Sequence, residues 1–219
     1  LSGGNFENLS ANPASVSTTI TDEAPGDTTT VSLSASGSGA EGGQITYTAT
    51  LSNVAQSPVS VSLSNGQTIT IAAGQSTGSI SVAAPSDDVY LDAGSVSAQI
   101  TGATGGNFEQ LTINPAPVST TITDTMDTVT ATLTASPSVA EGNAITYTVT
   151  LNAPAQSPVT VTLANGEIIS IAAGQSVGST TSPTTDNVHA GSSTVTNSIQ
   201  SLSGGNFENL SANPASVST

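Results

Sequence analysis

The chain has 219 residues and carries 15 acidic side chains but no lysine or arginine, so its formal net charge at pH 7 is −15. This charge excludes the electrostatics of nucleic-acid binding, which needs cationic side chains against phosphate, and it opposes contact with anionic membrane surfaces. There is no cysteine for a disulfide or a zinc–thiolate site, and no apolar run approaches the roughly 20 residues of a membrane-spanning helix, so we expect no direct membrane insertion.

The chain begins with a segment that is repeated at its end. Residues 1–18 are identical to residues 202–219. We therefore interpret residues 1–22 as the C-terminal strand of a preceding repeat and residues 23–124 as a complete repeat. Residues 125–219 are then a second repeat that is truncated at its C-terminal end. This organisation predicts a piece of a longer tandem array.

The two repeats match each other over most of their length. A shift of 100 residues places Asp27–Gly78 on Asp127–Gly178 with 33 identities in 52 positions, and beyond this stretch the shift is 99. One residue has therefore been lost between Ser179 and Asp186. Solenoid coils repeat every 20–50 residues or so, whereas these repeats are as long as a small domain, which predicts tandem domains.

Within each repeat, apolar residues alternate with Ser and Thr over short runs, which is the pattern of half-buried strands. In the first repeat the predicted strands cover residues 31–35, 45–51, 59–63, 69–71, 80–82, 96–100 and 118–122. The third and fourth are joined by Asn65-Gly66, a dipeptide favoured in tight hairpins. Seven short strands in a repeat of this length predict an all-β fold, namely tandem immunoglobulin-like β-sandwiches of about seven strands each.

The second repeat departs from the first along one predicted strand. Ile80 and Val82 of the first repeat correspond to Thr180 and approximately to Ser182. Burial of an aliphatic side chain contributes about 1.5–3 kcal/mol, so the loss of two such side chains is a substantial change. We expect this strand to be the weakest part of the second sandwich.

The acidic residues recur at matching places in the two repeats. Because successive strands alternate in direction, each loop can be assigned to one end of a sandwich. This places several acidic loops and the end of the last strand together where the first sandwich meets the second. The candidate metal ligands at this junction are Glu41, Asp87, Asp88, Asp92, Asp124, Asp127 and, from the second repeat, Glu208.

The same assignment predicts two further acidic clusters. At the opposite end of the first sandwich, Asp22 and Asp27 are expected to lie near Glu109, which belongs to a Gly-Gly-Asn-Phe-Glu loop. At the far end of the second sandwich, Glu141 and Asp186 form the counterpart of the junction cluster. The hairpin turn at Asn65-Gly66 is expected at the junction end as well.

A fold that gathers these carboxylates needs a cation from outside the polypeptide. Two carboxylates about 5 Å apart repel by roughly 3 kcal/mol at an effective dielectric constant of 20, and the chain has no basic side chain to offset this. Hard carboxylate oxygens suit calcium, which extracellular modules bind at about 10⁻⁴–10⁻³ M. The sequence therefore predicts Ca²⁺ as the bound cofactor.

An ordered series of motifs carries a resemblance to a known family. The run Ser138–Leu151 (Ser-Val-Ala-Glu-Gly-Asn-Ala-Ile-Thr-Tyr-Thr-Val-Thr-Leu) is followed by Asn-Gly, Ile-Ala-Ala-Gly-Gln-Ser and Gly-Gly-Asn-Phe-Glu. Nearly the whole chain resembles the extender repeats of giant RTX adhesins, which are bacterial surface proteins exported by type I secretion. The resemblance implies immunoglobulin-like domains stiffened by calcium at their junctions. It also implies ligand roles for Glu41, Glu141, Asp88, Asp124 and Asp127.

The function that follows from this resemblance is structural. We expect an extracellular calcium-stiffened rod at the bacterial cell surface, which projects an adhesive region in attachment or biofilm formation and has neighbouring repeats of the same chain as its partners. We expect that the protein is not an enzyme. Catalysis by Asp87, Asp88 and Asp92 can be imagined, but the chain has no Lys, Arg or Cys to assist them. The one histidine, His189, stands in the place of Tyr90 and is interpreted as a loop residue.

Two alternatives remain open from the sequence. Rows of Thr-x-Thr, such as residues 46–50, could bind ice or a glycan directly, although ordinary two-faced strands give the same pattern. The repeated end segment could instead pair with another chain, giving lateral or strand-addition self-association and a fibre.

Overall fold

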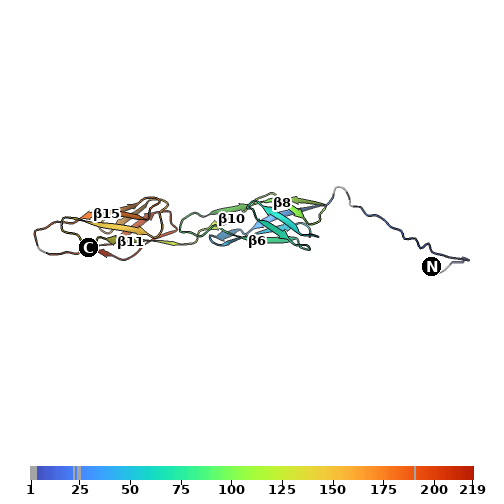
Figure 1. The fold of residues 1–219 in the computed structure, drawn as a ribbon, viewed down its shortest axis with the longest axis horizontal. Helices are drawn as coiled ribbons and strands as arrows, with labels where there is room; N and C mark the ends of the chain where they lie inside the picture. The colour runs from blue at the N-terminus through green and yellow to red at the C-terminus, as the bar shows by residue number, and fades with distance from the viewer. Residues whose placement is uncertain (1–3, 22, 24–25, 190) are drawn as a thin grey trace.

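The computed structural model describes residues 4–21, 23, 26–189 and 191–219 of the chain. Each repeat forms its own β-sandwich, and the two sandwiches lie end to end in one elongated rod (Figure 1). Residues 4–21 run away from the first sandwich and join no sheet. No helix in this described part of the chain is long and apolar enough to span a bilayer.

Ten strand segments build the first sandwich. They are β1 (Thr28–Ala35), β2 (Ser38–Ala40), β3 (Gln44–Leu51), β4 (Val59–Leu63), β5 (Thr68–Ile71), β6 (Thr77–Ala83), β7 (Gly94–Ala98), β8 (Ile100–Gly105), β9 (Gln110–Ile113) and β10 (Val118–Thr123). One layer is the sheet β6-β3-β1-β9, and the other contains β5-β4-β8 and β2-β10-β7. The predicted all-β class with tandem sandwiches is confirmed.

The second sandwich repeats this plan, with nine strand segments in its described residues. They are β11 (Thr128–Ala135), β12 (Ala144–Leu151), β13 (Val159–Leu163), β14 (Ile168–Ile171), β15 (Val177–Pro183), β16 (Thr196–Asn197), β17 (Ile199–Gly204), β18 (Asn209–Ala212) and β19 (Val217–Ser218). The sheets are β15-β12-β11-β18, β14-β13-β17 and the two-stranded pair β16-β19.

The alternation that predicted the strands also decides which side chains are inside. On β3, Ile45, Tyr47, Ala49 and Leu51 are all buried, whereas most of the threonines between them are exposed. The same holds for Val59, Val61 and Leu63 on β4. Because the chain has so few aromatic residues, the core is a thin layer of aliphatic side chains, with Tyr47 and Tyr147 as its largest members.

Three features of the strand arrangement differ from the sequence prediction. β2 and β9 were not expected; both pair in parallel, β2 with β10 and β9 with β1, and β2 (Ser-Gly-Ala) has no apolar alternation to reveal it. The strand expected at residues 96–100 is interrupted at Gln99, between β7 and β8, and the register of β8 against β4 shifts at Thr101. The Asn65-Gly66 hairpin does not reach the junction loops: it ends alongside this break, since Ser64 N–H donates to the Gln99 carbonyl (2.9 Å).

The strand with reduced hydrophobicity in the second repeat still forms. β15 pairs with β12 in the register that β6 uses against β3, so Thr180 lies opposite Tyr147 just as Ile80 lies opposite Tyr47. The shared register runs to Pro183, so the lost residue falls between Pro183 and Asp186. Ile80 and Val82 pack against the first core, whereas no residue of β15 belongs to the second hydrophobic cluster within the described residues. That this strand is the weakest part of its sandwich remains a prediction.

Candidate metal centre

The loop between β2 and β3 carries Glu41 to the junction. Glu41 N–H donates to the Thr123 carbonyl at the end of β10 (3.1 Å), and Gly42 N–H donates to the Pro85 carbonyl (2.7 Å). Gly42 has a φ of +65°, and a Cβ on it would lie 3.2 Å from Cβ of Asp87. Glycine suits this position, because its positive φ would strain a residue with a side chain and a Cβ here would crowd Asp87.

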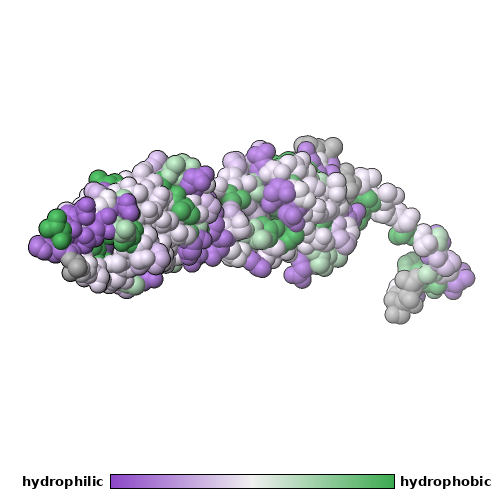
Figure 2. All heavy atoms as spheres, turned by 60° about the vertical axis from the view of Figure 1, so that its left-hand side comes forward, coloured by the Kyte–Doolittle hydropathy of each residue, from purple (hydrophilic) through white to green (hydrophobic). Residues whose placement is uncertain are grey.

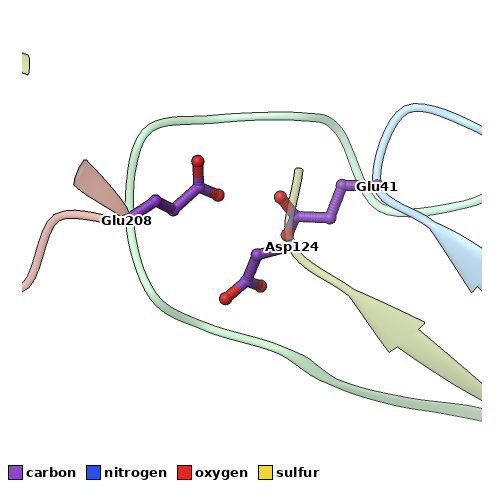
Figure 3. A group of neighbouring side chains, drawn as sticks. All are labelled: Glu41, Asp124 and Glu208. Atoms are coloured by element: carbon purple, nitrogen blue, oxygen red, sulfur yellow. The ribbon is translucent and has the colours of Figure 1, made fainter. Parts of the chain in front are cut away.

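Three carboxylates from both repeats meet at this place. Asp124 follows the last residue of β10, and Glu208 lies in the loop that precedes β18 of the second sandwich. Glu41, Asp124 and Glu208 each offer one carboxylate oxygen, and these oxygens lie within 4.8 Å of one another. The side chains approach one another from separate loops of the two sandwiches (Figure 3).

The polypeptide does not satisfy these carboxylates. Glu41 is only 7% exposed, and one oxygen of each of the three residues is buried without a hydrogen-bond partner: Oε2 of Glu41, Oδ1 of Asp124 and Oε1 of Glu208. Buried polar atoms are normally paired, so one such oxygen on each member of a group of neighbouring acids indicates a missing partner. The chain has no Lys or Arg that could supply it.

The pKa of Glu41 reflects its burial and its acidic neighbours. It is raised from 4.5 to about 7, first by burial, then by a hydrogen bond and charge from Asp92, and further by the charges of Asp124 and Asp88. A carboxyl group that shares a proton with another carboxylate is typical of acids held together without a cation.

The other acids that were predicted at the junction make different hydrogen bonds. Asp88 caps its own loop, because its Oδ1 accepts the Tyr90 N–H (2.7 Å). Asp87 accepts a hydrogen bond from the hydroxyl of Thr125. Asp127 takes part through its backbone, whose N–H donates to Oε2 of Glu208 (2.5 Å). Glu208 thus holds the start of the second sandwich with one oxygen and faces the acidic cluster with the other.

At the opposite end of the first sandwich, Glu109 repeats half of this arrangement. It accepts a hydrogen bond from the Asp27 N–H, as Glu208 does from Asp127. Asp22, which the sequence placed in this cluster, lies outside the described residues.

The far end of the second sandwich is chemically different from the junction. Glu141 is exposed, and its Oε1 accepts a hydrogen bond from the side-chain amide of Asn187 (2.9 Å). Asn187 stands where the first repeat has Asp88, and Gly191 stands where it has Asp92. Asp186 keeps its place against Gly142. The loop of residues 186–191 therefore holds two fewer negative charges than its counterpart in the first repeat, and it has an amide donor in the place of Asp88.

A direct contact between the sandwiches, which the sequence did not predict, accompanies the acidic cluster. Tyr90 stacks on Phe207, with ring centroids 5.6 Å apart, and the Tyr90 hydroxyl donates to the Pro154 carbonyl (2.8 Å). Backbone bonds lie on either side, from Leu91 N–H to the Asn206 carbonyl (3.1 Å) and from Glu208 N–H to the Val89 carbonyl (3.1 Å). The loop that holds Tyr90 and the loop that holds Phe207 thus pair through their backbones, as two short antiparallel strands would.

The Gly-Gly-Asn-Phe-Glu loop is shaped to present its phenylalanine. Gly205 has a φ of +91° and Asn206 a φ of 60°. A Cβ on Gly205 would lie 2.3 Å from the ring of Phe207, so the ring covers the glycine closely. No residue with a side chain fits there, and this explains why the motif needs its second glycine.

The three copies of this phenylalanine show what covers it. Phe6, which has no sandwich of its own in the chain, is 67% exposed; Phe108, in a sandwich without a docked tyrosine, is partly buried; Phe207 is 6% exposed. The recurrence of this phenylalanine in every repeat could have suggested that it has a packing partner. A single tyrosine in a loop belongs to no periodic pattern, however, so the sequence did not identify Tyr90 as that partner.

The raised pKa of Glu41 predicts a pH dependence. The folded chain without metal keeps a proton on Glu41 that the unfolded chain releases near pH 4.5, so this group favours folding below pH 4.5 and loses that contribution as the pH rises to about 7. Metal binding has the opposite dependence, because the ligand must be deprotonated. We expect calorimetric titrations to give a calcium affinity that rises about tenfold from pH 5.5 to 6.5 and levels off above about pH 7.

The control for this prediction is Glu41→Gln, which removes the titrating group and should flatten the profile. A wild-type affinity that is constant across this range would contradict it.

A family model divides the chain into two parts as the structure does. The family model described as "LapA domain" matches twice, over residues 27–125 and 127–219. No curated protein matches. A solved structure described as "Crystal structure of tetra-tandem repeat in extending region of large adhesion protein" is similar at 16% identity and a TM-score of 0.32; the match covers 87% of this chain and 47% of that one, so the chain spans about half its length. The resemblance to adhesin extender repeats is confirmed, and the chain belongs to the LapA domain family, of which it carries two consecutive copies.

Proposed function

We propose that the chain is a structural extender segment of a cell-surface adhesin, and that calcium bound at the junction of its repeats stiffens the rod. The observation that carries the proposal is the meeting of Glu41, Asp124 and Glu208, since two come from one sandwich and the third from the next. An ion held by all three would join the sandwiches across a linker of only Thr125 and Met126 between Asp124 and Asp127.

The donor set fits calcium better than the other common divalent ions. It consists of carboxylate oxygens, with further carboxylates from Asp88 and Asp92 close enough to act on Glu41. Calcium accepts six to eight oxygen ligands in flexible geometry, whereas zinc prefers nitrogen and sulfur, and magnesium demands a near-ideal octahedron. When bound, the ion supplies the positive charge that the polypeptide lacks.

A non-catalytic role is part of the proposal. Glu41, Asp124 and Glu208 converge on one another at the junction, and the sheet faces between the two ends of each sandwich carry mainly Ser and Thr. An extender at the cell surface would project an adhesive region encoded elsewhere, in attachment or biofilm formation, and secretion by a type I route accords with the resemblance to RTX adhesins.

The experiment is a distance measurement across the junction. The chain has no cysteine, so Ser81→Cys on β6 and Thr181→Cys on β15, both exposed, place one spin label on each sandwich. With calcium we expect one narrow distance distribution by pulsed electron paramagnetic resonance, and with a chelator a broad one, because the unneutralised carboxylates repel.

Two variants sharpen the measurement. Glu208→Gln should broaden the distribution even with calcium, whereas Glu167→Gln, which changes an acid on the surface of the second sandwich, should not. Equal widths with calcium and with chelator in the wild-type chain would refute the role of the metal.

A further inference from the structure

One loop of the first repeat serves both the acidic cluster and the contact between the sandwiches. Residues 87–92 read Asp-Asp-Val-Tyr-Leu-Asp, so acids flank an apolar centre. The charges of Asp88 and Asp92 both act on Glu41, and Asp92 also hydrogen-bonds to it. The centre, residues 89–91, lies against the second sandwich. On the face of the molecule drawn in Figure 2, hydrophilic and hydrophobic atoms accordingly lie side by side where the two sandwiches meet.

The centre of this loop makes the connections between the sandwiches. Within the described residues, the hydrogen bonds that join one sandwich to the other all involve Val89, Tyr90 or Leu91. One of them holds a member of the acidic cluster, because the Glu208 N–H donates to the Val89 carbonyl (3.1 Å). The neighbouring residue, Phe207, is stacked on Tyr90. The backbone of Glu208 is therefore placed by its contacts with residues 89–91.

The other hydrogen bond of Glu208 cannot place it relative to the first sandwich. Its Oε2 accepts the Asp127 N–H (2.5 Å), but Asp127 directly precedes β11, so this bond orients the side chain within its own repeat. One oxygen of Glu208 lies within 4.8 Å of oxygens of Glu41 and Asp124, and its Oε1 is buried without a partner. The approach of these carboxylates across the junction thus depends on the contacts of residues 89–91.

The Gly-Gly-Asn-Phe-Glu loop is held in shape by its own sandwich. Asn206 has a φ of 60° and donates its side-chain amide to Oε1 of Gln156 (2.7 Å). The homologous Asn107 has a φ of 58° and makes the same bond to Gln56 (2.8 Å), so the shape of the loop is a property of the repeat. A loop of fixed shape moves as one body, and the docking of its phenylalanine therefore also places its glutamate.

We propose that Tyr90 is a positioning residue for the metal site, and that calcium binding and the docking of the two sandwiches are coupled through Glu208. Tyr90 supplies no carboxylate, and its hydroxyl is engaged by the Pro154 carbonyl (2.8 Å). It acts by holding Phe207, and with it the Glu208 carboxylate, against the first sandwich. This inference rests on the proposed function, since it takes the junction carboxylates as calcium ligands.

The coupling follows from the charges at the junction. Without metal, the carboxylates of Glu41, Asp124 and Glu208 repel one another, and this repulsion works against the stacking of Phe207 on Tyr90. With metal, the ion attracts all three carboxylates, so metal binding and stacking draw the two loops together. Binding free energies couple reciprocally: if docking strengthens calcium binding by some factor, calcium strengthens docking by the same factor.

The first test is a calorimetric calcium titration of the 219-residue chain and its variants. Tyr90→Ala should weaken calcium binding at least about fivefold, although it removes no carboxylate. Tyr90→Phe keeps the ring and should restore the affinity to within about twofold of the wild type. His189→Ala, at the homologous position of the second repeat, is the matched control and should have no effect.

A double-mutant cycle shows whether Tyr90 acts through Glu208. Glu208→Gln alone should weaken calcium binding. Adding Tyr90→Ala to it should weaken binding by less than about a further twofold, because the carboxylate that Tyr90 positions is already gone. Losses that multiply in the double variant would mean that the two residues act independently, and the inference would then be wrong.

The second test measures the coupling in the opposite direction. The Glu208 amide should exchange its hydrogen at least about tenfold more slowly with calcium than with chelator, because calcium keeps its bond to the Val89 carbonyl closed. In Glu41→Gln, which changes a residue of the first sandwich, this slowing should be much smaller. The Leu163 amide, which donates to the Glu167 carbonyl within the second sandwich (2.9 Å), is the control and should respond far less to calcium.

The possible outcomes distinguish this inference from the proposed function. If the wild-type chain bound no calcium, both would fall. If the wild-type chain and Tyr90→Ala bound calcium with the same affinity, the ligand role of the carboxylates would stand and the coupling through Tyr90 would be wrong. Exchange of the wild-type Glu208 amide at the same rate with calcium and with chelator would likewise overturn the coupling alone.

Discussion

Replacing Glu41 with glutamine is expected to raise the melting temperature of the calcium-free chain and to lower that of the calcium-loaded chain. Without metal, Glu41 is buried against Asp92, Asp124 and Asp88, and glutamine removes its charge and supplies an amide that can donate to them. With metal, the same change deletes a ligand. The sign of the effect therefore depends on calcium.

The size of this effect follows from mass action. A site that only the folded state forms adds about 2.7 kcal/mol at calcium 100-fold above its dissociation constant. A tenfold loss of affinity should therefore lower the melting temperature of the calcium-loaded chain by about 5–10 °C. Calorimetric scans with calcium and with chelator measure both halves of the prediction.

Glu141→Gln is the matched control for this substitution. Glu141 occupies the homologous position, but it is exposed and already accepts the Asn187 amide, so both shifts should be small. If Glu41→Gln moved the melting temperature in the same direction under both conditions, the carboxylate would be acting in packing and not as a ligand.

Replacing Tyr90 with alanine is expected to loosen the junction even when calcium is bound. The substitution removes the ring that covers Phe207 and the hydrogen bond to the Pro154 carbonyl. An aromatic pair contributes about 0.5–1.5 kcal/mol beyond its burial, and a hydrogen bond about 0.5–1.5 kcal/mol. With the lost apolar burial, the two sandwiches should be held together less tightly by about 2–4 kcal/mol.

The measurement is the distance distribution between the labels at positions 81 and 181, recorded with saturating calcium. Tyr90→Ala should broaden it, and amide exchange at the Val89–Glu208 backbone bond should accelerate. Tyr90→Phe keeps the ring and should broaden it much less. His189→Ala, at the homologous position in the second repeat, should leave it unchanged. An unaltered width in Tyr90→Ala would mean that docking contributes nothing beyond the metal.

Much of the fold could be predicted because its determinants are local. Alternation of Val, Ile and Leu with Ser and Thr fixes both the strands and their buried faces. The grouping of Glu41 with Asp124 and Glu208 could be predicted as well, since it needs only the alternation of strand direction and the order of the repeats.

What could not be predicted depends on contacts without a sequence period. β2 forms only because β10 offers it an edge, and the Asn65-Gly66 turn ends beside Gln99, where β7 has ended and β8 begins. The docking of Tyr90 on Phe207 joins two loops more than 100 residues apart, and neither loop alone requires the other. The amide of Asn187, which turns a repelling position into a donor for Glu141, depends on a side-chain direction that spacing does not give.

The two parallel pairings in the first sandwich determine how it responds to tension. β1 and β2 open the repeat, β9 and β10 close it, and the parallel contacts β1–β9 and β2–β10 join its first segment to its last over four and three residue pairs. A pull along the rod drags these partners past each other lengthwise. The hydrogen bonds are then loaded in shear and share the force, whereas bonds in a hairpin pulled from one end would open in sequence. A tether built from such repeats would resist hydrodynamic drag until an entire clamp fails at once.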